Sequence, residues 1–363
     1  MKTSAAAASV EAPAQESIKL ETDSHGVERI ALQKHGWQTW KWQGHKVNFC
    51  QAGDHGPPIV LIHGFGASMY HWRYNIPALA KTHRVFAMDM LGFGWSEKPV
   101  LEYSGCNIWA NQLADFIKEV VHEPAVVVGN SLGGYTCLLA AAQAPEQVAG
   151  VVLVNSAGRF SAPQAAVETA LQDDSSVALR DAVQEAAEPA DSSPQEASTS
   201  GRGSESAGPG EPKGGVWSRV WEPVRSVGMR AAVYISFLAT KQPARIRQVL
   251  KQVYIEHQNV DEDLVQSIVI PAGDPNAAAV FYQVISGWGQ PVPDLLSRLK
   301  VPMLLLWGEL DPWIGSGKAE QIQRAYPRAE YAGMQAGHCP HDDLPSEFNS
   351  KLLAWLDKQG APS

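Results

Sequence analysis

The chain contains few cysteines, and none of them are closely paired. Its 363 residues include four cysteines, Cys50, Cys106, Cys137 and Cys339, and no C-x-x-C pair. This spacing provides neither a disulfide framework nor a zinc site, and it favours a reducing compartment. We therefore expect no metal centre and no cofactor.

Basic residues are outnumbered, and long apolar runs are missing. The 29 Lys and Arg residues face 38 Asp and Glu residues, which gives a net charge of −9 and argues against nucleic-acid binding. No apolar run approaches the roughly 20 residues of a transmembrane helix. The opening MKTSAAAASV has one lysine and no arginine, so it is a poor secretory signal and at best a fragment of a transit peptide.

A serine flanked by glycines lies between two apolar runs. Three valines, 126–128, predict a strand that is buried on both faces, and residues 132–144 predict a packed helix. Between them, Gly129, Ser131 and Gly133 form the G-x-S-x-G pattern of a nucleophile elbow. The serine backbone is strained there, and this is tolerable only if the residues two before and two after it lack side chains. The pattern is short, so its meaning depends on a histidine, an acid and a second oxyanion amide elsewhere.

Two earlier strands end in glycine-rich loops. The apolar run 58–62 leads into His63-Gly64-Phe65-Gly66, and the amides of Phe65 and Leu132 together predict an oxyanion hole. We expect His63 to brace this loop rather than to act as a base. The run 84–89 leads into a second loop, 91–96, which Asp89 is expected to brace by hydrogen bonds.

The acid is expected late in the chain. The strand predicted over 148–154 is followed by Asn155, whose amide cannot balance an imidazolium charge. A strand over 301–307 is followed by Glu309 and Asp311, and Pro312 forces a turn that places Asp311 to accept from a histidine. We therefore predict Asp311 as the acid and not Glu309.

The histidine is expected after the last strand. His338 follows a glycine in a loop after residues 329–334, where an imidazole can reach over the sheet edge. His341, Asp342 and Asp343 are expected to be solvated or to cap the closing amphipathic helix over 344–356. The order Ser131, Asp311, His338 is that of α/β-hydrolase triads, in which Ser131 attacks, His338 shuttles the proton and Asp311 steadies the imidazolium.

The strand–helix rhythm divides the chain into four parts. Residues 1–28 are expected to be disordered, 29–160 and 300–358 to form the two parts of an α/β core, and 161–299 to form a helical lid. Within the lid, the Pro/Gly/Ser-rich residues 186–215 predict a disordered acidic insert. The basic, aromatic stretch 217–250 predicts a lid helix, and peripheral contact with an anionic membrane is one interpretation of it.

The chain resembles the α/β-hydrolase superfamily from about Trp37 to Leu356. More narrowly, it resembles the plant, algal and cyanobacterial plastid hydrolases that include pheophytinase and chlorophyll dephytylase. The motifs that carry this resemblance are WKWQGH at 40–45, HGFGAS at 63–68, HWRYN at 71–75, LGFGWS at 91–96, GNSLGGY at 129–135 and GHCPHD at 337–342. The resemblance implies a mostly parallel sheet flanked by helices with an inserted lid, a chloroplast location, and hydrolysis of the phytyl ester of a chlorophyll pigment.

Three functions fit these observations. The first is a serine esterase acting on a small apolar or amphiphilic ester through an acyl-enzyme. The second is a carbon–carbon bond hydrolase with the same triad, and the third is a small-molecule receptor built on a hydrolase fold. Epoxide hydrolase and haloalkane dehalogenase chemistry is disfavoured, because related folds use an aspartate at the elbow for it.

Overall fold

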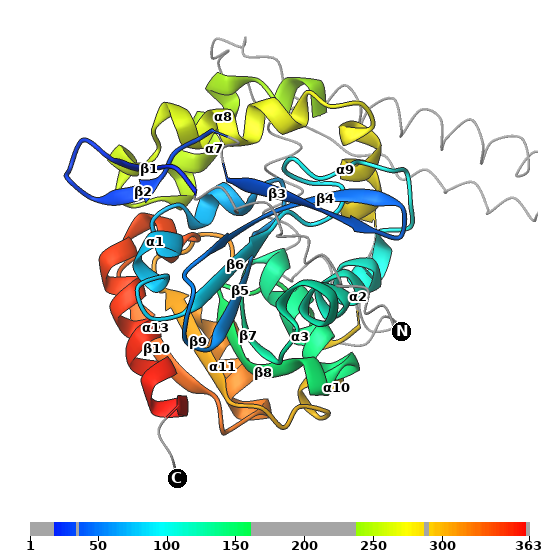
Figure 1. The fold of residues 1–363 in the computed structure, drawn as a ribbon, viewed down its shortest axis with the longest axis vertical. Coiled ribbons are helices and arrows are strands. Elements are labelled where there is room, and N and C mark those ends of the chain that lie inside the picture. Colours follow the sequence, from blue (N-terminus) through cyan, green and yellow to red (C-terminus); the bar gives the residue numbers. More distant parts are fainter. Residues whose placement is uncertain (1–17, 34–35, 161–236, 287–289, 361–363) are drawn as a thin grey trace, which may run out of the picture.

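The apolar runs form the strands of one central sheet. In the computed structural model, which describes residues 18–33, 36–160, 237–286 and 290–360, an eight-stranded sheet has the order β10-β9-β8-β7-β5-β6-β4-β3 (Figure 1). The strands from β10 to β6 are parallel, and β4 and β3 continue the sheet antiparallel. The bounds are β3 Trp37–Trp42, β4 His45–Ala52, β5 Pro58–Ile62, β6 Arg84–Met88, β7 Ala125–Asn130, β8 Val148–Val154, β9 Met303–Gly308 and β10 Glu330–Met334.

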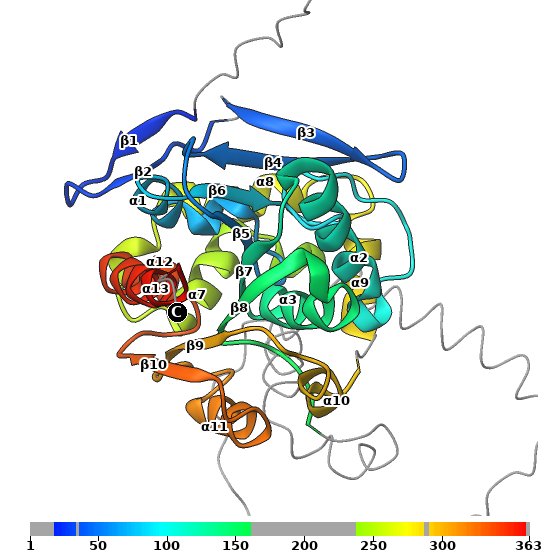
Figure 2. The same ribbon diagram turned by 60° about the horizontal axis from the view of Figure 1, so that its bottom comes forward.

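Helices cover both faces of this sheet (Figure 2). On one face lie α2 (Asn107–Phe116), which continues as a π-helical turn over Ile117–Val121, and α3 (Leu132–Gln143), with α10 (Val292–Leu296) and α11 (Ser316–Ala325). On the other lie α1 (Asn75–Leu79), α12 (Pro340–Asp343) and α13 (Pro345–Gly360). Strands β5, β7 and β9 are buried along their whole length, as a sheet sandwiched between two helical layers requires. The predicted α/β-hydrolase fold is confirmed.

A third group of helices lies beyond one end of the sheet. It comprises α7 (Pro243–Val253), a 3-10 turn over His257–Asn259, α8 (Glu262–Ala272) and α9 (Ala277–Ser286), and we call it the α7–α9 segment (Figure 1). Ile246, Leu250 and Val253 of α7 pack with Leu264 and Val265 of α8 in a small apolar cluster of their own. The acidic insert 186–215 and the basic residues 217–236 lie outside the described residues.

The start of the described chain is more ordered than its composition predicts. We expected disorder up to residue 28, which is wrong for residues 18–28: β1 (Leu20–Thr22) pairs antiparallel with β2 (Glu28–Ile30). Asp23 closes the turn between them by accepting from the amides of His25 and Val27, each at 2.8 Å. It also accepts from the hydroxyl of Tyr74 at 2.9 Å, so a long-range contact holds this hairpin on the core.

The first part of the core matches its prediction closely. The aromatic stretch at 37–49 forms a hairpin, β3 and β4, with Gln43 and Gly44 at positive φ in its turn. Among the residues that the structure describes, no helix combines the length and apolarity needed to cross a membrane.

Candidate functional site

Ser131 lies at a sharp turn between β7 and α3. Its backbone has φ 53° and ψ −118°, a strained conformation for a residue with a side chain. A Cβ on Gly129 would come within 2.3 Å of the Gly133 carbonyl oxygen, and one on Gly133 within 2.4 Å of the carbonyl oxygens of Ile62 and His63. The glycines therefore allow β5, β7 and α3 to meet closely enough to form this turn, which lifts the serine above the sheet edge.

Asp311 and His338 meet at the same edge. Each follows the end of a parallel strand, β9 and β10, and Nδ1 of His338 lies 2.7 Å from Oδ2 of Asp311. A backbone amide, that of Trp313, donates to the other carboxylate oxygen at 2.8 Å. Asp311 is fully buried at its side chain, and His338 is 6% exposed, so the pair is largely shielded from water.

The charge of Asp311 is stabilised by these donors. Burial by itself raises the pKa of the carboxyl group, but His338 and the surrounding hydrogen bonds outweigh burial and hold the pKa below its usual value. Asp311 is consequently an anion at neutral pH, oriented toward the imidazole ring.

Asn155, at the end of β8, fixes the position of Asp311. Its side-chain amide donates to Oδ2 of Asp311 at 2.8 Å and to the carbonyl of Gly308 at 3.0 Å. Its side-chain oxygen accepts from the amide of Gly308 at 2.8 Å. Asn155 is completely buried and has a positive φ of 40°. Its donation to Asp311 was not predicted from the sequence.

Asn130 joins the serine strand to the histidine loop. Its side-chain amide donates to the carbonyl of His338 at 2.9 Å and to that of Val154 at 3.2 Å. The next residue, Ser131, donates its own amide to Val154 at 2.9 Å. The ends of β7 and β8 and the loop after β10 are thus held together next to the serine.

The two glycine-rich loops are braced as predicted. Nδ1 of His63 lies 2.7 Å from the Gly64 carbonyl, and its Nε2 accepts from the amide of Met90 at 3.0 Å, which defines a neutral tautomer. Burial lowers the pKa of His63, in agreement with that state. Asp89 accepts from the amides of Met69 and Trp95 at 2.7 and 2.8 Å, so both bracing roles are confirmed.

An apolar cavity of about 380 Å³ opens above these loops. Gly64, Phe65, Ser131, Leu132 and His338 line its floor at the strand ends. The α7–α9 segment supplies much of the remaining wall, and Tyr103, Tyr135, Phe237 and Trp313 add aromatic surface. The apolar residues from this segment are Ile246, Val249, Leu250, Val253, Ile268, Ala272, Phe281 and Val284. Such a cavity suits an apolar ligand held over the serine.

The oxyanion amides were predicted at Phe65 and Leu132. Both residues line this cavity, and Leu132 is the first residue of α3, where the helix has no earlier turn to accept from its amide. Glu309, the other carboxylate that follows β9, is exposed. It accepts hydrogen bonds from Tyr331 and Gln335.

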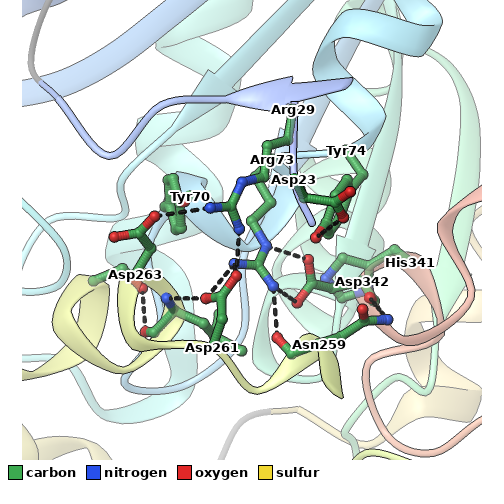
Figure 3. A network of polar contacts seen from close by, with 12 residues as sticks. Asp23, Arg29, Tyr70, Arg73, Tyr74, Asn259, Asp261, Asp263, His341 and Asp342 are labelled. Atoms are coloured by element: carbon green, nitrogen blue, oxygen red, sulfur yellow. Dashed lines mark hydrogen bonds and ion pairs between the residues drawn. The ribbon is translucent and has the colours of Figure 1, made fainter. Parts of the chain in front are cut away.

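His341, Asp342 and Asp343 are not solvated, so the expectation of solvent exposure is wrong. They are 0%, 0% and 1% exposed. Asp342 forms an ion pair with the fully buried Arg73, with Nε to Oδ1 at 2.8 Å, and Arg73 also donates to Asp261 of the α7–α9 segment (Figure 3). Desolvation raises the pKa of Asp342, which the nearby Arg73 opposes. Asp343 instead accepts from backbone amides, among them that of Gly337 at 2.8 Å.

Side chains that could bind a metal are not grouped in the described part of the chain. No cluster of three or more His, Cys, Asp or Glu side chains there could hold a metal ion. Cys339, next to His338, is buried in the apolar cluster of α7 and α8, and burial raises the pKa of its thiol well above the usual value.

The family to which the chain belongs agrees with the fold described above. Residues 57–345 match the α/β hydrolase fold family, and the chain belongs to this family. It is therefore a hydrolase of the α/β class.

Several individual proteins are similar to this chain. The chain is similar to a chloroplastic pheophytinase of Arabidopsis thaliana, with 26% identity over 93% of this chain and 69% of the relative. It is also similar to a 2-hydroxymuconate semialdehyde hydrolase of Pseudomonas sp. (strain CF600), with 39% identity over 32% of this chain and 41% of the relative. A solved serine hydrolase involved in carbazole degradation has a TM-score of 0.62 and 21% identity, covering 88% of this chain and 98% of that structure.

Proposed function

We propose that the protein is a serine hydrolase that cleaves a carboxylic ester through an acyl-enzyme. The observation that carries this proposal is the hydrogen bond of 2.7 Å between His338 and the buried Asp311, together with the cavity that His338 lines with Ser131 on its strained turn. These are the three roles that acyl transfer requires: a nucleophile, a base and an acid that orients the base.

The reaction proceeds in two halves. Nε2 of His338 accepts the hydroxyl proton of Ser131 while the serine oxygen attacks the ester carbonyl carbon. Asp311, which accepts from Asn155 and the Trp313 amide, stabilises the imidazolium that forms. The tetrahedral intermediate collapses, the alcohol leaves with the proton from His338, and an acyl–serine ester remains. Water then repeats the sequence, which releases the acid and restores the serine.

The oxyanion of both intermediates is assigned to the amides of Phe65 and Leu132. The negative charge develops next to the loop after β5 and the first turn of α3, and the first turn of a helix has backbone N–H groups without helical partners that can bind an anion. Removing one donor in comparable sites costs on the order of 10²–10³ in rate.

The substrate class follows from the cavity and from the relatives. Phe, Ile, Val and Leu side chains from several elements line it, so an apolar chain is favoured on at least one side of the ester. Similarity to the pheophytinase favours the phytyl ester of a chlorophyll pigment and a chloroplast location.

A second function is supported by the other relatives. The same serine, histidine and aspartate can hydrolyse a carbon–carbon bond in a diketone-like substrate, and the similarity to 2-hydroxymuconate semialdehyde hydrolase favours this reaction. That match covers 32% of this chain, whereas the pheophytinase match covers 93%, so we favour the ester. A receptor on a hydrolase fold is the third alternative, which predicts binding without turnover.

The test compares the wild-type protein with Ser131→Ala on p-nitrophenyl esters, pheophytin, chlorophyll and a diketone-like substrate. We expect release of p-nitrophenol and phytol by the wild-type protein and a loss of at least 10³-fold in the variant. Turnover of the diketone alone would support the carbon–carbon hydrolase. Ester hydrolysis that survives the substitution would refute the assignment of Ser131.

A further inference from the structure

The loop that carries His338 is bonded to the end of α7 through the backbone. The amide of His338 donates to the carbonyl of Val253 at 2.8 Å. A Cβ on Gly337 would lie 2.0 Å from the same carbonyl oxygen, so glycine is required for this approach. Thus no side chain separates the two segments, although they are far apart in the sequence.

Asp343 strengthens the same junction from the other side. One of its oxygens accepts from the amide of Gly337 at 2.8 Å, and the other accepts from the amide of Glu256 at 2.8 Å. The amide of Ile255 lies 3.1 Å from both oxygens. A single buried carboxylate therefore bridges the residue before His338 and the two residues that follow Tyr254, the residue capping α7.

Asp342 makes a parallel connection with side chains. It accepts from the hydroxyl of Tyr254 at 2.9 Å and from Arg73 of the core. Arg73 extends to the carbonyl of Asn259 at 2.7 Å and to Asp261, so the end of the 3-10 turn and the first cap of α8 are attached to the same guanidinium group (Figure 3).

The end of α7 also faces the cavity. Leu250 and Val253 line it together with His338, and Val253 is the residue whose carbonyl holds the His338 amide. A ligand that packs against this part of α7 therefore contacts the residue whose carbonyl positions the His338 loop.

We propose that Asp343 is a positioning residue that couples the α7–α9 segment to His338, so that occupation of the apolar cavity and placement of the base are one event. The inference rests on the proposed function, because His338 matters to turnover only if it is the base. Asp343 acts through backbone amides and does not touch the ring. Its removal leaves Gly337, Ile255 and Glu256 with unpaired amides on both sides of the junction.

The test uses Asp343→Asn, with Asp263→Asn as the matched control. Both changes replace a carboxylate by an amide of the same size, but Asp263 is 40% exposed at its side chain and binds Arg29, away from the His338 loop. Active sites are counted with an alkyl fluorophosphonate, and kcat and KM are measured per titrated site. Hydrogen exchange is followed in the segments 253–257 and 336–343.

We expect Asp343→Asn to lower kcat per titrated site about 10- to 100-fold, to raise KM for long-chain esters more than for short ones, and to accelerate exchange in both segments together. The control should change kcat less than about 2-fold. An unchanged kcat per site, or faster exchange in only one segment, would overturn the coupling.

Tyr254→Phe provides a second variant in case Asp343→Asn does not fold. It removes only the hydroxyl that reaches Asp342, and it should raise exchange in both segments with a smaller loss of kcat. Failure of either effect with this folded variant would again overturn the coupling. If the wild-type protein neither reacts with the fluorophosphonate nor turns over esters, the proposed function fails, whereas joint exchange of the two segments is measured without any activity.

Discussion

Replacing His71 by leucine should make the stability of the protein less sensitive to acid. His71 lies in the 3-10 turn Met69–Trp72, is 5% exposed and lines the cavity, and its Nε2 has no partner among the described residues. Burial, with further electrostatic contributions from His63 and Arg73, lowers its pKa to about 3. In the unfolded chain the pKa of a histidine is about 6.5.

The sign and the magnitude follow from this difference. Between the two pKa values, the unfolded chain binds a proton at this position and the folded chain does not, so stability falls as the pH falls. From pH 7 to pH 5 the free energy of unfolding should drop by about 2 kcal/mol on account of His71 alone. His63 and His341, whose pKa values burial also lowers, add losses of the same sign. The low pKa of Asp311 acts only in more acidic solution, below about pH 4.

The assay is urea unfolding at 25 °C at pH 7 and at pH 5. The difference between the two free energies should be smaller by about 2 kcal/mol in His71→Leu than in the wild-type protein. His257→Leu is the control: it replaces an exposed histidine and should leave the difference unchanged. An equal pH dependence in His71→Leu and the wild-type protein would refute the view that His71 is buried in its neutral form.

Two further substitutions test the geometry of the site. Asn155→Ala removes the side-chain donor to Asp311 and should lower kcat/KM about 10- to 100-fold, measured with a p-nitrophenyl ester; an unchanged value would show that Asp311 does not need this donor. Gly133→Ala places a methyl group 2.4 Å from the carbonyl oxygen of Ile62 and should lower the midpoint of thermal unfolding by several degrees or prevent folding. The control Gly317→Ala, whose methyl group would have no atom within 4 Å, should leave the midpoint unchanged. Similar midpoints for the two variants would contradict the close packing around Ser131.

The local parts of the site could be predicted from the sequence because each is a short pattern with its own physical cause. Three consecutive valines followed by a glycine-flanked serine indicate a buried strand and a turn, and the structure has β7 and α3 there. Asp311 and His338 likewise follow apolar runs that predict strands, and in the structure these residues are within hydrogen-bond distance of each other. Parallel strands bring their carboxyl ends to one edge, so the order of the motifs implied their proximity.

The parts that could not be predicted depend on contacts between distant segments. The burial of Asp342 follows from Arg73, which is 269 positions away, and that of Asp343 from the amides of Ile255 and Glu256. Two adjacent carboxylates before a helix look like a solvated cap in the sequence. The position of Asn155 could have indicated its role. It directly follows β8, which lies between the strands that precede Ser131 and Asp311, so a polar side chain there is close to both loops.

Three carboxylates surround the His338 loop, and their donors decide which one serves the imidazole. Asp342 is neutralised by Arg73, and Asp343 is occupied by backbone amides on both sides of the junction with α7. Asp311 receives a side-chain amide on one oxygen and a backbone amide on the other, and it still directs Oδ2 to His338. A buried charge is retained only where its hydrogen bonds compensate desolvation. Asp342 and Asp343 have such hydrogen bonds without contacting the His338 imidazole. Arg73, Asn155 and the backbone thus leave Asp311 as the carboxylate that reaches His338, and Asp342 and Asp343 bind the segment after α7 instead.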